Sequence, residues 1–130
     1  MSQIAQRLRI LVADADLHTR DATMLALRAR GHDVVALGEW PAIAEALSGA
    51  FDAIVADMVM APLAHGEIVD RLRRAQPKAV LVVVSSGFLL TSRPVARAFG
   101  ADAFIERPAS MGTLEAAIAR ALSEHPSAAA

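Results

Sequence analysis

The chain contains no cysteine, and its only lysine is Lys78. Without cysteine, thiol catalysis, disulfide bonds and cysteine-based zinc sites are excluded. No apolar run approaches the roughly 18 residues that a membrane-spanning helix needs. Residues 1–9 also lack the basic region and apolar block of a signal peptide. We therefore expect a cytoplasmic protein that makes no contact with a membrane.

An excess of charge of one sign is also missing. The formal net charge is −1, so no overall field favours nucleic acid. The arginine-rich segment 71–74 is interpreted as the solvated face of a helix. Aromatic residues make up 4% of the chain and hydrophobic residues 55%, so the core must be built from Ala, Val, Leu and Ile. A chain of 130 residues predicts one domain, expected over residues 1–122 with a frayed tail at 123–130.

Strand patterns and helix patterns alternate along the chain. Strands are expected at about 8–13, 33–37, 52–57, 80–84 and 103–105, and helices at about 17–30, 41–47, 66–75, 93–99 and 111–122. A near-continuous apolar run is typical of a strand buried on both faces of a parallel sheet. The alternation predicts an α/β fold, a flavodoxin-like (βα)5 doubly wound parallel sheet with strand order 2-1-3-4-5.

Two of these strands end in an aspartate. Asp14 follows the first strand, with Asp16 close behind, and Asp57 ends the third. In this strand order the first and third strands are neighbours, and ligands bind beyond the carboxyl ends of such strands. The three carboxylates are expected to converge there, with Ser85 and Arg107 approaching from the fourth and fifth strands. Two carboxylates at this edge could hold a divalent cation or present a nucleophilic oxygen.

With these elements in register, the chain resembles a receiver domain of two-component response regulators over about residues 8–122. The matching segments are the acidic motif at 10–16, the phosphoacceptor strand and loop at 57–66, the switch hydroxyl in Val84-Ser85-Ser86-Gly87, and the segment at 100–108 that carries an aromatic switch, a basic residue and a cis-proline. The resemblance implies that Asp57 takes a phosphoryl group from a sensor histidine kinase or a phosphotransfer protein. It also makes Ser85 the switch hydroxyl and Phe104 the switch aromatic.

The resemblance further implies an Mg²⁺ ion held by Asp14, Asp57 and the main-chain carbonyl of Val59. Asp16 is a further candidate ligand, although its position is more typical of the N-cap of the helix at 17–30. In the family, the fourth helix, fifth strand and fifth helix form the usual partner and dimer face. We therefore expect a downstream signalling protein, or a second copy of the chain, to bind there.

Three departures from the family pattern predict an atypical receiver. Ala15 stands where a second acidic metal ligand is usual, and Arg107 stands where lysine is usual. In the loop after Asp57, Pro62 and Gly66 each fall one residue late. We expect Mg²⁺ binding to be weak or absent and phosphorylation to be weakened. Arg107 is expected to pair with Asp57 or Asp14 and to fill the space of the metal and the lysine.

The sequence is therefore interpreted as a stand-alone signalling and protein-binding module rather than an enzyme. The alternative is a small haloacid-dehalogenase-like phosphatase, in which Asp14 would be the nucleophile and Asp16 the general acid. The five units leave no room for a DNA-binding helix-turn-helix. The histidines share no ligand spacing and are all expected to be exposed, at positions His18, His32, His65 and His125.

Overall fold

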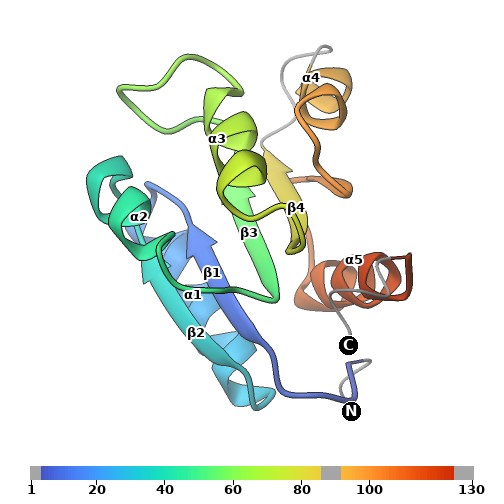
Figure 1. Ribbon diagram of the computed structural model, residues 1–130. Coiled ribbons are helices and arrows are strands. Elements are labelled where there is room, and N and C mark those ends of the chain that lie inside the picture. Colours follow the sequence, from blue (N-terminus) through green and yellow to red (C-terminus); the bar gives the residue numbers. More distant parts are fainter. Residues whose placement is uncertain (1–3, 86–91, 125–130) are drawn as a thin grey trace.

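The computed structural model describes residues 4–85 and 92–124, and strands and helices alternate through five units (Figure 1). In chain order the elements are β1 (Arg9–Ala13), α1 (Leu17–Ala29), β2 (Asp33–Leu37), α2 (Trp40–Ala46), β3 (Ala53–Asp57), α3 (Glu67–Ala75), β4 (Val80–Ser85), α4 (Ser92–Ala98), β5 (Ala103–Glu106) and α5 (Met111–Glu124). Each predicted element is present, and its ends lie within two residues of the prediction. The predicted residues Ser86 and Gly87, and the tail from residue 125, lie outside the described residues.

The five strands form one parallel sheet in the order β2-β1-β3-β4-β5, which confirms the predicted flavodoxin-like fold. The register pairs Ala13 of β1 with Ala56 of β3, and Asp57 of β3 with Val84 of β4. The carboxyl ends of these central strands therefore lie level with one another. This alignment brings the strand-end carboxylates together.

Helices cover both faces of the sheet, with α1 and α5 on one face and α2, α3 and α4 on the other (Figure 1). Successive residues of a strand point to opposite faces, so both cores draw on each central strand. In β4, Val82 and Val84 join the core beneath α1 and α5, while Leu81 and Val83 join the core beneath the other three helices. Burial on both faces is the physical reason for the continuous apolar run at residues 80–84.

The ends of the helices follow the signals in the sequence. Asp16 caps α1 by accepting a hydrogen bond from the Thr19 amide at 2.9 Å, as predicted. Ser110 likewise caps α5 by accepting from the Thr113 amide at 3.1 Å. Gly31 follows α1 with φ of 93°, a conformation that favours glycine. The peptide bond between Arg107 and Pro108 is cis, as the resemblance implied.

The structure corrects the prediction for the arginine-rich segment. Arg74 is solvated, with 79% of its side chain exposed, but the side chain of Arg73 is only 19% exposed. Arg73 donates to the carbonyls of Gly100 and Ala79 and pairs with Asp102 at 2.8 Å. The segment was expected to be solvated throughout because its charge is high. Arg73 instead lies where the end of α3 meets the start of β4 and the turn before β5.

The structure also corrects the prediction for His32. His18 and His65 are exposed as expected, His32 is buried, and His125 lies outside the described residues. The Nδ1 atom of His32 accepts the Leu8 amide proton at 3.1 Å, so the imidazole supplies an acceptor at the edge of β1. This hydrogen bond joins residues that are 24 positions apart, so the spacing of residues within one segment does not reveal it. Within residues 4–85 and 92–124, no helix is both long enough and apolar enough to cross a membrane.

Candidate functional site

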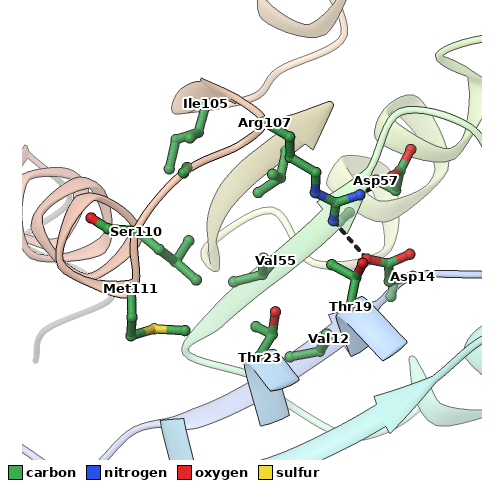
Figure 2. A pocket seen from close by; sticks show the side chains of 15 residues that line it. Val12, Asp14, Thr19, Thr23, Val55, Asp57, Ile105, Arg107, Ser110 and Met111 are labelled. Atoms are coloured by element: carbon green, nitrogen blue, oxygen red, sulfur yellow. Dashed lines mark hydrogen bonds and ion pairs between the residues drawn. The ribbon is translucent and has the colours of Figure 1, made fainter. Parts of the chain in front are cut away.

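Three side chains from three strands meet at the carboxyl edge of the sheet (Figure 2). Arg107, which follows β5, donates through Nη2 to Oδ2 of Asp14 at 2.6 Å. The same guanidinium donates through Nη1 to Oδ2 of Asp57 at 2.8 Å. One cation therefore joins the carboxylates that end β1 and β3. The predicted pairing of Arg107 is confirmed, and it includes both aspartates.

The position of Arg107 follows from the sheet. Its amide donates to the carbonyl of Ser85 at 2.6 Å, which holds the end of β5 beside the end of β4. β3 and β1 lie beyond β4, and neighbouring strands are about 4.8 Å apart, so the side chain must reach across β4. Arginine provides that length. Its planar fork also offers two separate N–H groups to two carboxylates, which a lysine ammonium would meet as a single point charge.

The site is largely closed to solvent. The exposed fractions of the side chains are 5% for Asp14, 19% for Asp57 and 26% for Arg107. Burial raises the pKa of the Asp57 carboxyl above its usual value, and the charge of Asp14 acts in the same direction. The Val59 amide and the Arg107 guanidinium oppose this rise. Arg107 therefore offsets part of the cost of holding two carboxylates side by side in a poorly solvated place.

Each aspartate at this edge has a second local partner. Oδ1 of Asp57 accepts the Val59 amide at 2.9 Å, and Oδ1 of Asp14 accepts the Asp16 amide at 2.9 Å. The carboxylate of Asp16 is occupied by the amide and hydroxyl of Thr19, at 2.9 and 2.6 Å. The phosphatase alternative needs Asp14 as a free nucleophile and Asp16 as a free general acid. Both side chains are committed to other partners.

These contacts do not suit an Mg²⁺ site. Within the described part of the chain, no three His, Cys, Asp or Glu side chains are grouped so that they could hold a metal ion. Oδ2 of Asp14 and Oδ2 of Asp57 face the guanidinium of Arg107, and Ala15 between Asp14 and Asp16 carries no oxygen on its side chain. Mg²⁺ prefers a near-octahedral set of oxygens. It could take this place only after Arg107 had moved away.

The two predicted switch residues lie on the two neighbouring strands, Ser85 at the end of β4 and Phe104 within β5. Ser85 ends β4 one residue past the partner of Asp57, and it is buried. Phe104 lies in β5, half-buried, with the guanidinium carbon of Arg93 5.0 Å from the centre of its ring. Val59, whose carbonyl was the third predicted metal ligand, exposes 54% of its surface.

A cavity of about 80 Å³ lies next to the bridged carboxylates, and sequence reasoning did not foresee it (Figure 2). Thr19 and Thr23 line it from α1, Ser110 and Met111 line it from the start of α5, and Arg107 lies at its edge. Its lining combines these polar groups with apolar side chains such as Val12 and Ile105, and its volume could accommodate a few water molecules. The spacing of the two threonines, one helical turn apart, was the only signal in the sequence.

A second arginine near the site was also missed. Nη1 of Arg20 donates to the main-chain carbonyl of Asp14 at 2.9 Å. This contact fixes the backbone that carries Asp14 and leaves the carboxylate to Arg107. Arg20 lies in the first turn of α1, four residues after Asp16. Arginines are common on the exposed faces of helices, so the sequence did not indicate this contact.

No protein-family model matches the chain, and no curated protein matches it. Its structure is nevertheless similar to those of response regulator receiver domains. A CheY-like receiver domain from Methanospirillum hungatei JF-1 shares 23% sequence identity at a TM-score of 0.83, over 94% of this chain and 98% of that one. A response regulator from Burkholderia pseudomallei, solved with a phosphorylated aspartic acid, a calcium ion and citrate, shares 23% identity at a TM-score of 0.79, over 96% of this chain and 74% of that one.

Full-length FixJ from B. japonicum shares 26% identity at a TM-score of 0.84. The match covers 96% of this chain and 62% of the FixJ chain. The fold of the protein is therefore that of the CheY-like receiver domains, in agreement with the resemblance seen in the sequence.

Proposed function

We propose that the chain is an atypical receiver module of a two-component phosphorelay, in which Asp57 occupies the phosphoacceptor position. Its usual partners would be a sensor histidine kinase or a phosphotransfer protein, together with a downstream signalling protein. Mg²⁺ binding and phosphorylation are weak in this proposal, and the module acts mainly by binding other proteins.

One observation carries the proposal, namely the guanidinium of Arg107 held between Asp14 and Asp57 at 2.6 and 2.8 Å. A nucleophilic carboxylate needs a free oxygen and a phosphoryl group needs compensating positive charge nearby. Both Asp57 oxygens are engaged, one by Arg107 and the other by the Val59 amide. Phosphorylation must first displace a charge-assisted hydrogen bond in a poorly solvated site, so it is disfavoured relative to a receiver with a lysine and a bound metal.

For the protein-binding role, we infer that the partner face is formed by α4, β5 and α5. α4 is a helix of seven residues with Pro94 near its start, so it forms few internal hydrogen bonds. A partner that binds one arrangement of such a helix more tightly shifts its equilibrium without any phosphorylation. The same face is also where a second copy of the chain would bind if the module forms a dimer.

The test is incubation with Mg²⁺ and a small phosphodonor such as acetyl phosphate, read by intact mass. The wild type is expected to show a minor adduct or none, and any adduct should disappear in Asp57→Asn. The double variant Ala15→Asp with Arg107→Lys should raise the yield, because it restores a carboxylate ligand and a compact cation. A near-complete adduct in the wild type, unchanged in the double variant, would show that the site is an ordinary phosphoacceptor.

A further inference from the structure

A groove of about 540 Å³ runs between α4 and α5 across β5, the edge strand of the sheet. Arg93 and Arg97 line it from α4, and Arg120 lines it from α5. Phe104 and small residues such as Ala117 form the surface between the arginines. The groove has the volume of a small-molecule site, and guanidinium groups from two helices face it.

Among the described residues, little compensates the positive charge in this groove. The guanidinium groups of Arg93 and Arg97 form no ion pair or hydrogen bond with any residue in the ranges 4–85 and 92–124, whereas most other arginines of the chain do. Arg120 lies 3.6 Å from Glu124, and both side chains are well exposed, so that pair is weak. Asp102, the other acid in the groove, is already bound to Arg73. An anionic occupant would give these guanidinium groups their partners.

The groove also offers a flat surface for stacking. The guanidinium carbon of Arg93 lies over the Phe104 ring, 5.0 Å from its centre, so the ring covers one side of the group. The side chain of Arg93 is exposed. A guanidinium plane supported in this way can stack against a planar aromatic ligand, as arginine does with nucleic acid bases.

The small residues in the groove favour a small ligand over a peptide that inserts a large apolar side chain there. Interfaces with peptides depend on large apolar side chains that fill deep pockets. Ala103, Ala116 and Ala117 line this groove with small apolar side chains instead. Arginine, by contrast, binds phosphate oxygens through two parallel N–H groups. Besides Arg93, the groove presents Arg97 and Arg120 for such contacts.

We propose that this groove binds a nucleotide, with the base stacked on Arg93 and the phosphates held by Arg97 and Arg120. A nucleoside di- or triphosphate has the charge, the aromatic ring and the size that the groove accommodates. If the face made by α4, β5 and α5 is the partner face, a point that rests on the proposed function, the nucleotide would compete with the protein partner. The nucleotide would then regulate a receiver whose phosphoacceptor site is held closed by Arg107.

The experiment is a titration of the full chain with ATP and GTP carrying an N-methylanthraniloyl fluorophore, followed by fluorescence anisotropy with EDTA present. Saturable binding is expected for at least one of the two nucleotides. Arg97→Ala and Arg120→Ala should each weaken it about tenfold, the effect of losing one charge-assisted contact. Arg93→Lys keeps the positive charge but removes the planar guanidinium group, so it should also weaken binding. Arg74→Ala, an exposed arginine on α3, is the matched control and should have no effect.

Competition distinguishes the possible anions. Unlabelled nucleotide should displace the probe at least tenfold more effectively than inorganic pyrophosphate or a polyglutamate peptide, because only the nucleotide stacks on Arg93. Equal competition by pyrophosphate or polyglutamate would overturn the proposal, since the groove would then recognise charge alone. Absence of saturable binding, or binding that survives both Arg97→Ala and Arg120→Ala, would overturn it as well. Asp57→Asn should leave nucleotide binding intact, so a failed phosphodonor experiment does not affect this result.

Discussion

At the scale of single residues, the most consequential position is Arg107. In a receiver with a lysine and a metal ion, two separate cations balance the negative charge of the carboxylates. One of them, the metal ion, exchanges with the solution. Here one covalently attached guanidinium contacts both Asp14 and Asp57. The compensating charge is therefore present at every Mg²⁺ concentration. This arrangement holds the two carboxylates in one geometry without a bound ligand.

A substitution at position 15 tests whether a carboxylate there strengthens metal binding. Ala15→Asp places a third carboxylate between Asp14 and Asp16, and it should strengthen Mg²⁺ binding by at least about tenfold. Losing a residue that only contacts a metal ligand already costs about tenfold in metal affinity, and a direct ligand contributes at least as much. Isothermal titration calorimetry with MgCl₂ measures the change. Ala15→Asn is the control of similar size without the charge. Equal affinities in the wild type and Ala15→Asp would show that position 15 does not limit metal binding.

His32 predicts a pH dependence of stability. Burial lowers the pKa of His32 below its usual 6.5, Glu115 opposes this shift, and Arg30 supports it. The nitrogen that accepts the Leu8 amide must remain unprotonated. Below about pH 6.5 the unfolded chain takes up a proton that the folded protein does not. The stability is therefore complete above that pH and is lost as the pH falls toward the folded-state pKa.

The measurement is the free energy of unfolding in urea between pH 7.5 and 5.5. The loss should approach at most about 1.4 kcal/mol per pH unit from this residue. His32→Asn keeps an acceptor near the Leu8 amide but cannot titrate, so its curve should be flatter. His18→Asn removes an exposed histidine and should follow the wild type. Parallel curves for the wild type and His32→Asn would contradict the prediction.

At the scale of elements, the sequence allowed the strands and helices to be predicted almost to the residue. The reason is local: residues 80–84 are β-branched or aliphatic throughout, and Gly31 and Gly100 stand where helices end. That Arg107 would pair with Asp57 or Asp14 was also foreseen, because the strand order fixes which strand ends meet, and the structure shows both pairs. The roles of Arg73 and His32 were not, since each contacts residues far along the chain that only the packing of the helices brings near.

Arg73 joins the loops that connect α3 to β4 and α4 to β5. Its guanidinium binds the carbonyls that follow α3, the carbonyl of Ala79 before β4, the carbonyl of Gly100 after α4, and the carboxylate of Asp102. Arg73→Ala should destabilise the fold by about 2–4 kcal/mol, because it leaves several poorly solvated acceptors without a donor. Arg74→Ala, which removes an exposed i,i+4 pair, should cost less than about 0.5 kcal/mol. Similar urea midpoints for the two variants would contradict this role of Arg73.

A further prediction at the scale of elements concerns the face made by α4, β5 and α5. Charge reversal by Arg97→Glu and Arg120→Glu should weaken self-association or partner binding more than Asp57→Asn does, because the variants change the face directly. Light scattering detects self-association, and a pull-down detects a partner. A larger effect of Asp57→Asn would instead favour a phosphorylation-driven module. Arg74→Glu controls for the change in net charge.

At the scale of the whole molecule, two cores on opposite faces of the sheet hold the strand ends in a fixed relation. One core draws α1 and α5 onto the sheet, and the other draws α2, α3 and α4 onto it. Asp14 and Asp57 bring two like charges close to these cores at the carboxyl edge of the sheet. Asp14 and Asp57 are therefore a cost to folding that Arg107 offsets. The stability of the fold and the accessibility of the Asp57 carboxylate are coupled through this one side chain.

This coupling predicts the behaviour of Arg107→Ala. Removing the guanidinium leaves two neighbouring carboxylates uncompensated, with Asp14 almost fully buried, so the free energy of unfolding should fall by about 2–4 kcal/mol. The same variant opens the place that the guanidinium occupied, so Mg²⁺ should now bind and raise the midpoint of thermal unfolding. The wild type should respond much less to Mg²⁺, because Arg107 already contacts both carboxylates. Differential scanning fluorimetry with and without MgCl₂ compares the two proteins.

The variant Arg107→Ala with Asp57→Asn removes one of the two negative charges, and it should recover part of the stability and lose the response to Mg²⁺. If Mg²⁺ stabilises the wild type as strongly as Arg107→Ala, then Arg107 does not take the place of the metal.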